Sequence, residues 1–308
     1  MEMIEVHIGV VGIGSIAQKA YLPVYAGLDG VSFSFCTRKE QTLEQLHEQY
    51  GWDSLYTSLD DLIASGITAA FVHAATAAHP QIVEKLLNHG ISVYIDKPLS
   101  DQFETTKHLT GLAESKGVLL MTGFNRRFAP MNRRLAEVRE KSTIVYQKNR
   151  INDPKEIRTF VYDDFIHVVD TIRFLLDEPV ETIDVHARKN RQGRYTDLTV
   201  IFHAGQQLAV ALMNRISGVN RESVQAIAPS GEYFVRNLTE LEQIRGIETT
   251  RIPFGDWEST LYKRGFEQIV RAFIDALSNH LNEPITKSDA LETHLICEKI
   301  IHKALKNS

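Results

Sequence analysis

Short apolar runs alternate with amphipathic segments along the first part of the chain. The apolar runs carry almost no charge and cover Glu5–Val11, Val31–Cys36, Ala69–His73, Ser92–Ile95 and Val118–Thr122. Such runs are typical of strands buried on both faces. Helical periodicity covers Pro80–Asn88 and Gln102–Ser115, each followed by a glycine that signals a helix end. The alternation predicts an α/β fold with a doubly wound parallel sheet.

The pattern changes after Gly123, where consecutive strand-like runs follow one another through short polar turns. The predicted elements are helices over Met131–Arg139 and Phe165–Leu176, strands over Ile144–Lys148, Ile183–Ala187, Leu198–His203, Leu208–Met213, Glu222–Ile227 and Tyr233–Val235, and helices over Leu261–Ser278 and Ser288–Leu305. Short turns between adjacent strands favour an antiparallel sheet. We expect domains over residues 1–122 and 123–308, with the C-terminal helix free to pack back on the first.

Composition narrows the class of protein. The chain has 308 residues, 43% of them apolar and 24% charged, with a net charge of −5. This balance predicts two globular domains and gives no general affinity for nucleic acid or anionic membranes. The two cysteines, Cys36 and Cys297, lack metal-ligand spacing, which favours reduced thiols, no metal site and a cytoplasmic location. We expect neither a signal peptide nor a membrane span.

A glycine-rich turn follows the first predicted strand. Gly12, Ile13, Gly14, Ser15 and Ile16 lead into a helix, with Ala17 at the third small position. Glycines there let the backbone approach a pyrophosphate, whose charge the helix N-terminus meets. A chance glycine pair in a tight turn is the alternative. The strand before and the helix after favour dinucleotide binding.

The second predicted strand ends in Thr37, Arg38 and Lys39, without the acidic residue that accepts hydrogen bonds from a ribose. A small hydroxyl beside two cations suits a 2′-phosphate, so we expect NADP to be preferred over NAD. The alternative is a solvated basic turn.

Lys97 ends another apolar strand, between Asp96 and Pro98. Ligands of open α/β sheets bind beyond the carboxyl ends of the strands, so Lys97 is a candidate to orient or deprotonate an alcohol. A surface lysine at a strand end is the alternative.

The last candidate set lies on a predicted helix. Asp163, His167 and Asp170 are spaced to share one helix face, which would hold the imidazole in one tautomer as a general acid/base. The alternative is an acidic first turn that favours the helix dipole, with a structural histidine behind it.

The ordered motifs resemble the Gfo/Idh/MocA oxidoreductases along essentially the whole chain. They are Gly12–Ala17, Asp96-Lys97-Pro98-Leu99, Gly123–Pro130 and Asp163…His167…Asp170, and together with Val72-His73 and Arg221–Ala226 they are most similar to the MviM-type virulence-factor branch. Three positions depart from the family pattern, since Asp96 replaces a glutamate, Phe165 a glycine and Ala75 a proline.

The resemblance implies a Rossmann domain, then a substrate-binding domain with an open, mainly antiparallel sheet that forms homodimers or homotetramers. It implies hydride transfer between NAD or NADP and a hydroxyl carbon of a sugar, cyclitol or related polyol. By position, Lys97, Asp163 and His167 match catalytic residues. The residues that match cofactor-lining segments are Ala74, Ala75, His79, Asp96, Asn125 and Arg126.

The resulting hypothesis places the site between the domains, where His167 takes the hydroxyl proton with help from Lys97 and orientation by Asp163. Two other interpretations stay open. One is a regulator that senses a dinucleotide or sugar on the same fold. The other is a glycosidase or lyase that oxidises and re-reduces the same sugar.

Overall fold

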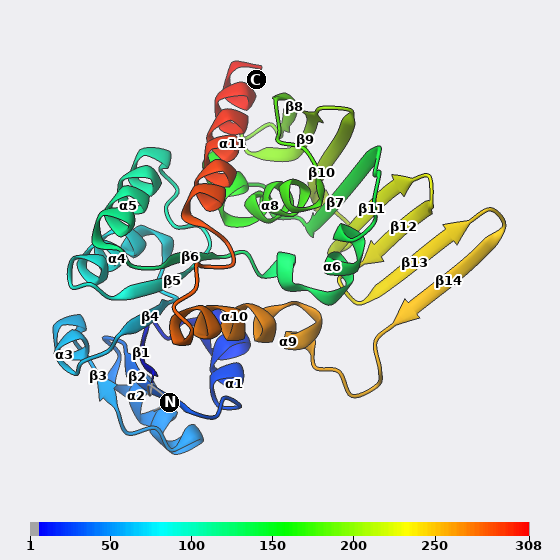
Figure 1. Cartoon of the computed structure of the whole chain (residues 1–308). Helices are drawn as coiled ribbons and strands as arrows, with labels where there is room; N and C mark the ends of the chain where they lie inside the picture. The colour runs from blue at the N-terminus through cyan, green and yellow to red at the C-terminus, as the bar shows by residue number, and fades with distance from the viewer. Residues whose placement is uncertain (1–5, 308) are drawn as a thin grey trace. The chain divides into compact units, whose positions relative to one another are not determined.

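The computed structural model describes residues 6–307 and divides into two compact units (Figure 1). The first unit comprises the chain up to Gly123 together with Phe266–Glu292. The second unit comprises Phe124–Gly265 together with Thr293–Ser308. Each unit is therefore built from two separate stretches of the sequence.

The first unit contains the predicted parallel sheet. Its six strands run in the order β3-β2-β1-β4-β5-β6, and all neighbours pair in parallel. Their bounds are β1 (Val6–Val11), β2 (Val31–Cys36), β3 (Leu55–Tyr56), β4 (Ala69–Val72), β5 (Ser92–Asp96) and β6 (Leu120–Gly123). Every residue of β4 and β6 is buried, which explains the uncharged runs. Among the described strands of this sheet, only the short β3 was not predicted from the sequence.

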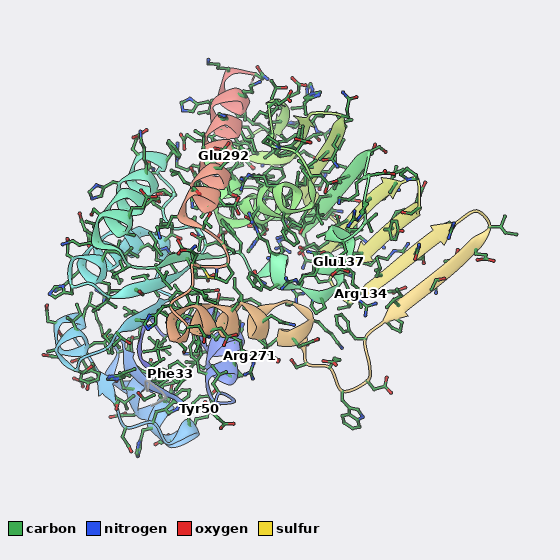
Figure 2. The ribbon with its side chains drawn as sticks, in the orientation of Figure 1. Phe33, Tyr50, Arg134, Glu137, Arg271 and Glu292 are labelled. Atoms are coloured by element: carbon green, nitrogen blue, oxygen red, sulfur yellow. The ribbon has the colours of Figure 1, made fainter. Side chains whose placement is uncertain are left out.

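Helices cover both faces of this sheet, as a doubly wound fold requires. They are η1 (Ala17–Tyr21), α1 (Leu22–Tyr25), α2 (Glu40–Tyr50), α3 (Leu59–Ala64), η2 (Thr76–Ala78), α4 (His79–Asn88), α5 (Phe103–Lys116) and α10 (Phe266–Ser278). Phe33 on β2 is labelled in Figure 2. Its ring stacks on that of Tyr25, with 4.8 Å between the ring centroids. Phe273 of α10 packs on Phe71 at 5.4 Å and on Tyr94 at 5.7 Å. A helix from late in the chain thus completes the core of the first unit.

The helix predicted over Leu261–Ser278 is wrong in one respect, because it is two helices. α9 (Thr260–Lys263) ends before Gly265, which has a φ of 80°, and α10 begins at Phe266. A Cβ at Gly265 would lie 2.3 Å from the backbone oxygen of Asn125, so only glycine fits there. The positive φ and the close approach both end the helix.

The second unit contains an eight-stranded sheet in the order β14-β13-β12-β11-β7-β10-β9-β8. Its strands are β7 (Thr143–Ile151), β8 (Thr182–Lys189), β9 (Tyr195–Ala204), β10 (Gln207–Ser217), β11 (Arg221–Ala228), β12 (Gly231–Arg236), β13 (Glu240–Arg245) and β14 (Glu248–Pro253). β7 and β10 pair in parallel and the other neighbours are antiparallel. The predicted mainly antiparallel sheet is confirmed, whereas β13 and β14 were not predicted.

The helices of the second unit are η3 (Asn125–Phe128), α6 (Pro130–Ala136), α7 (Ile157–Thr159), η4 (Phe160–Phe165), α8 (Ile166–Leu175), α9 and most of α11 (Lys287–Lys306). α8 packs on β7 and β10, and α6 on β12. Burial therefore alternates along the strands, with Ala209, Ala211 and Met213 of β10 buried and the residues between them half-buried. In the part of the chain that the structure describes, no helix has both the length and the apolar character to cross a bilayer.

Candidate active site

The glycine-rich turn is tied to the end of the neighbouring strand, because the Gly12 amide donates to the Cys36 oxygen at 2.9 Å. Gly12 has a φ of 89°, and a Cβ there would lie 2.6 Å from the Ala74 nitrogen. A Cβ at Gly14 would meet nothing within 4 Å. Gly12 therefore serves the packing of two loops, whereas Gly14 faces open space.

A helix begins directly after this open space, and its first backbone bond runs from Gln18 to the Gly14 oxygen at 3.0 Å. The amides of Ser15, Ile16 and Ala17 precede that bond, so helix geometry gives them no partner within the helix. Free amides at a helix N-terminus bind anions. These residues fit the pyrophosphate of a dinucleotide.

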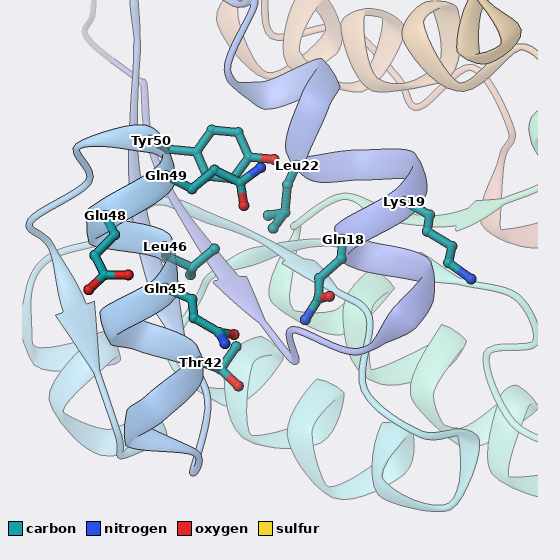
Figure 3. A pocket seen from close by; sticks show the side chains of 9 residues that line it. All are labelled: Gln18, Lys19, Leu22, Thr42, Gln45, Leu46, Glu48, Gln49 and Tyr50. Carbon is teal, nitrogen blue, oxygen red and sulfur yellow. The ribbon is translucent and has the colours of Figure 1, made fainter.

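A hollow of about 580 Å³ lies between η1–α1 and α2, beside the predicted phosphate loop (Figure 3). Gln18 extends into it from one side and Thr42 and Gln45 from the other. Its only cation is Lys19, and Glu48 also lines it. One cation beside one carboxylate does not make this hollow a phosphate site. The predicted 2′-phosphate residues Thr37, Arg38 and Lys39 do not line it, and Arg38 and Lys39 are exposed.

The Asp96 carboxylate faces the core at the end of β5. Its Oδ1 accepts from the Lys97 amide at 3.0 Å and from the Tyr21 hydroxyl at 3.3 Å, and Tyr21 lies 3.0 Å from the Tyr94 hydroxyl. Burial raises the pKa of Asp96, an effect that Lys97 opposes. Burial also raises the pKa of both tyrosines well above the ordinary value, so both remain neutral donors. Asp96 thus fixes the backbone of Lys97.

His79, at the start of α4, joins the loops that follow β4 and β5. It is only 1% exposed, with Nδ1 at 2.8 Å from the Pro98 oxygen and Nε2 at 2.8 Å from the Ala74 oxygen. The side chain is therefore occupied by backbone groups. In the loop after β4, Ala74 is half-buried and Ala75 is exposed.

In the second unit, Asn125 and Arg126 begin η3, and protein groups hold both side chains. Asn125 Nδ2 donates to the Arg264 oxygen at 2.8 Å. Arg126, 7% exposed, donates from Nε and Nη2 to the two Glu222 oxygens at 2.5 and 2.9 Å. Tyr146 also donates to Glu222. Burial would raise the pKa of Glu222, but Arg126 and Lys148 hold it well below its usual range.

This pair belongs to a larger buried network that the sequence patterns did not reveal. Asp164 on η4 receives Lys148 Nζ at 2.7 Å, Arg150 Nε at 2.6 Å and Arg215 Nη2 at 3.4 Å. Burial, helped by the charge of Arg126, lowers the pKa of Lys148 to about 8. One feature of the sequence could have revealed this network: Lys148 and Arg150 are two basic residues that share one face of β7.

The Asp163–His167–Asp170 set lies on η4 and α8. η4 is a π-helix, whose wider turn changes the spacing of an ordinary α-helix. Asp163 is exposed, His167 is 8% exposed and Asp170 is 1% exposed. The Asp170 carboxylate accepts from Arg127 at 2.9 and 2.6 Å and from Thr293 at 3.2 Å. Asp170 is thus engaged in structural bonds, and Asp163 is the more accessible carboxylate.

Known proteins match both parts of the chain. Residues 6–124 match the model of an oxidoreductase family with an NAD-binding Rossmann fold, and residues 130–246 match a YceM-like C-terminal domain. The oxidoreductase YceM of Salmonella typhimurium is 32% identical over 97% of this chain and 98% of its own length. The chain belongs to the Gfo/Idh/MocA oxidoreductase family.

Solved structures agree with this Gfo/Idh/MocA membership. The dehydrogenase MviM from Clostridium difficile superimposes with a TM-score of 0.92 at 30% identity, covering 96% of this chain and 99% of the other. The myo-inositol 2-dehydrogenase of Thermotoga maritima is a partial relative, 26% identical over 57% of this chain and 56% of its own length. The protein is an oxidoreductase of a family with an NAD-binding Rossmann fold. The predicted family is confirmed, whereas the preference between NAD and NADP stays a prediction.

The predicted Gfo/Idh/MocA site residues fall into two groups, one in each unit. The first unit holds Gly12, Ile13, Gly14, Ser15, Ile16, Thr37, Arg38, Ala74, Ala75, His79, Asp96 and Lys97. The second unit holds Asn125, Arg126, Asp163 and His167. The roles of these residues, and the meeting of Lys97 with Asp163 and His167, stay predictions.

Proposed function

We propose that this protein moves a hydride between a nicotinamide cofactor and a hydroxyl carbon of a sugar, cyclitol or related polyol. The observation that carries the proposal is the position of Lys97. It follows β5 directly, at the same sheet edge as the glycine-rich turn after β1. Ligands of open α/β sheets bind at that edge.

The nicotinamide, when bound, supplies the hydride acceptor or donor. The residues of this chain handle the proton. His167 takes the hydroxyl proton, Lys97 donates a hydrogen bond to the same oxygen, and Asp163 orients the imidazole. In the reverse direction His167 returns the proton.

Replacing His167 with Ala or Lys97 with Met should lower turnover by roughly two to four orders of magnitude, the usual contribution of a positioned acid/base. The rate of nicotinamide absorbance change on an identified substrate measures it. His186→Ala is the matched control, since His186 is exposed on β8. Turnover within a few-fold of the parent chain in both site variants would refute these roles.

We also propose that NADP is preferred over NAD, because Thr37, Arg38 and Lys39 offer a hydroxyl and two cations where a carboxylate would favour a free ribose. Dissociation constants for the two cofactors, and for the Arg38→Ala variant, test the preference. Tighter binding of NAD by the parent chain would contradict it.

The polyol substrate class is supported by the inositol dehydrogenase among the relatives. A cofactor-reduction screen over sugars, amino sugars and inositols, run with NADP and with NAD, would identify the substrate. A sensor would bind a ligand without turnover. A glycosidase or lyase of this fold would convert its substrate with no net change in cofactor absorbance.

The assembly we propose is a homodimer or homotetramer formed through the eight-stranded sheet. The face away from α8 carries half-buried apolar side chains at alternate positions, including Ile201, Val210 and Leu212. Apolar patches of this kind mark interaction surfaces. Light scattering at several concentrations tests the assembly, and Leu212→Glu should shift it towards monomer. A parent chain that stays monomeric throughout would exclude it.

A further inference from the structure

His79 contacts two backbone oxygens that belong to different loops. Nδ1 lies 2.8 Å from the Pro98 oxygen, one residue beyond Lys97. Nε2 lies 2.8 Å from the Ala74 oxygen, in the loop after β4. Both distances are those of good hydrogen bonds. The imidazole therefore spans the carboxyl ends of two adjacent parallel strands, β4 and β5.

Because both partners of the His79 ring are carbonyl oxygens, they determine how many protons its nitrogens must carry. A carbonyl oxygen accepts hydrogen bonds and never donates, and a neutral imidazole carries only one N–H. Both contacts are satisfied only when both ring nitrogens carry a proton. We propose that His79 is held as an imidazolium that clamps these two loops together.

The charges around His79 fit a cation. The Asp96 carboxylate interacts with both His79 and Lys97. The dipole of α4 opposes a cation at its first residue, so the carbonyls and Asp96 must outweigh it. His73 is a further titratable group on which His79 acts. Burial first, and the charge of His79 second, lower the pKa of His73 to about 3.

His73 provides an internal contrast within the same unit. Its Nε2 lies 2.7 Å from the Tyr25 hydroxyl, a group that can accept or donate. A neutral imidazole satisfies that contact. Two buried histidines six positions apart in sequence are thus held in opposite charge states.

The clamp bears on the proposed function, on which this step rests. The loop of Ala74 and Ala75 and the strand end of Lys97 both lie at the predicted cofactor edge, and His79 sets their separation. His79 is a positioning residue, since its nitrogens are occupied by the backbone. Loss of one proton leaves one carbonyl facing a lone pair, so that loop is released and cofactor affinity falls as pH rises.

The first test reads the protons directly. Nitrogen-15 spectra of the imidazole rings, recorded on the full chain without cofactor, are followed from about pH 6 to about pH 9, the range where histidine charge normally changes. We expect two protonated nitrogens for His79 at the lower end and a neutral ring for His73 throughout. His79→Gln and His73→Gln assign the signals. A neutral His79 ring across the whole range would overturn the proposal.

The second test measures the consequence. Dissociation constants for NADPH are compared in the parent chain, His79→Gln and His89→Gln across the same range. His89 is the matched control because it is exposed at the other end of α4 and bonds one carbonyl through one nitrogen. We expect His79→Gln to bind about tenfold more weakly at low pH, the effect of losing one charge-assisted hydrogen bond, and to lose the alkaline decline.

The two tests fail separately. A parent decline that survives in His79→Gln would contradict the link between the clamp and the cofactor. A parent chain that never binds NADPH or NADH would contradict the proposed function, while the spectra would still decide the charge of His79. If His79→Gln does not fold by circular dichroism, His79→Asn serves in its place and the spectra of the parent chain still decide the proposal.

Discussion

At the scale of single residues, the second unit depends on buried charges whose partners are within hydrogen-bonding distance. Glu222 has a side chain only 10% exposed and pairs with Arg126, whose side chain is 8% exposed. Removing one member of such a pair strands the other in a low-dielectric interior. The network is therefore sensitive to single truncations.

Glu222→Ala should lower the free energy of unfolding of the second unit by about 3–5 kcal/mol, because Arg126 and Tyr146 both lose their acceptor. Urea titration followed by circular dichroism measures it. Asp60→Asn is the control. The Asp60 side chain is 74% exposed, so its ion pair with Lys85 should contribute under about 1 kcal/mol. Equal losses in both variants would show that burial does not decide the cost.

The surroundings of Asp164 predict how its contribution to folding stability changes in acid. Burial would raise its pKa, but Lys148 and Arg150 hold it well below the usual value. The unfolded chain therefore binds more protons than the folded chain below about pH 4, and the contribution of Asp164 to stability falls as pH falls through that range. Above it the contribution is fully present.

The difference in unfolding free energy between the parent chain and Asp164→Asn should consequently shrink as pH is lowered from about 5 towards about 2. Urea titrations at intervals across that window measure the difference. A gap that stays constant or widens would mean that the carboxylate of Asp164 is not stabilised by its cationic neighbours in the folded state.

At the scale of elements, the two glycines of the turn after β1 have separable duties. Gly12→Ala should destabilise the first unit by about 1–3 kcal/mol, because a Cβ at a φ of 89° meets the Ala74 backbone. Thermal unfolding measures this effect.

Gly14→Ala is the matched variant, since its Cβ meets nothing within 4 Å. It should unfold at a temperature near that of the parent chain and bind NADPH more weakly, because the methyl group enters the space we assign to the pyrophosphate. Unchanged affinity for NADPH in Gly14→Ala would show that the pyrophosphate does not bind at this turn.

The elements also show why sequence patterns predicted one part of the molecule better than another. Strands such as β4 and β6 are buried on both faces, so an uncharged run marks them clearly. β14 is an edge strand with most of its residues exposed and charged or polar, and such a strand resembles a loop. The break at Gly265 depends on contact with Asn125 and Ala129, which are distant in sequence.

The candidate site follows the same division. Gly12–Ile16 and Lys97 could be proposed from the sequence because each stands at the end of a recognisable strand, and their roles stay predictions. The ion network of Lys148, Asp164 and Glu222 was missed because isolated charges are normally assigned to the surface. Only pairing across strands makes their burial tolerable, and pairing is a tertiary property.

At the scale of the whole molecule, neither unit is a continuous segment. Residues 1–123 contain all six parallel strands but lack α10. A fragment of residues 1–123 should therefore leave Phe71 and Tyr94 uncovered where Phe273 packs. We expect it to bind a hydrophobic dye and to melt without cooperativity.

Joining Phe266–Glu292 to that fragment through a flexible linker should restore a cooperative transition and reduce dye binding. Thermal melts by circular dichroism, with dye fluorescence, compare the two fragments with the full chain. Cooperative unfolding of the shorter fragment alone would show that α10 is dispensable for the core.

The late position of α10 also matters during synthesis. A ribosome adds about 5–20 residues per second, so the first strands emerge on the order of ten seconds before Phe266–Ser278. For that interval an apolar face of the first sheet lacks the cover of α10, while Phe124–Gly265 of the second unit is being translated. The first part of the chain to be made is then among the last to finish folding. Its yield in a cell should depend on translation speed and on chaperones that bind exposed apolar surface.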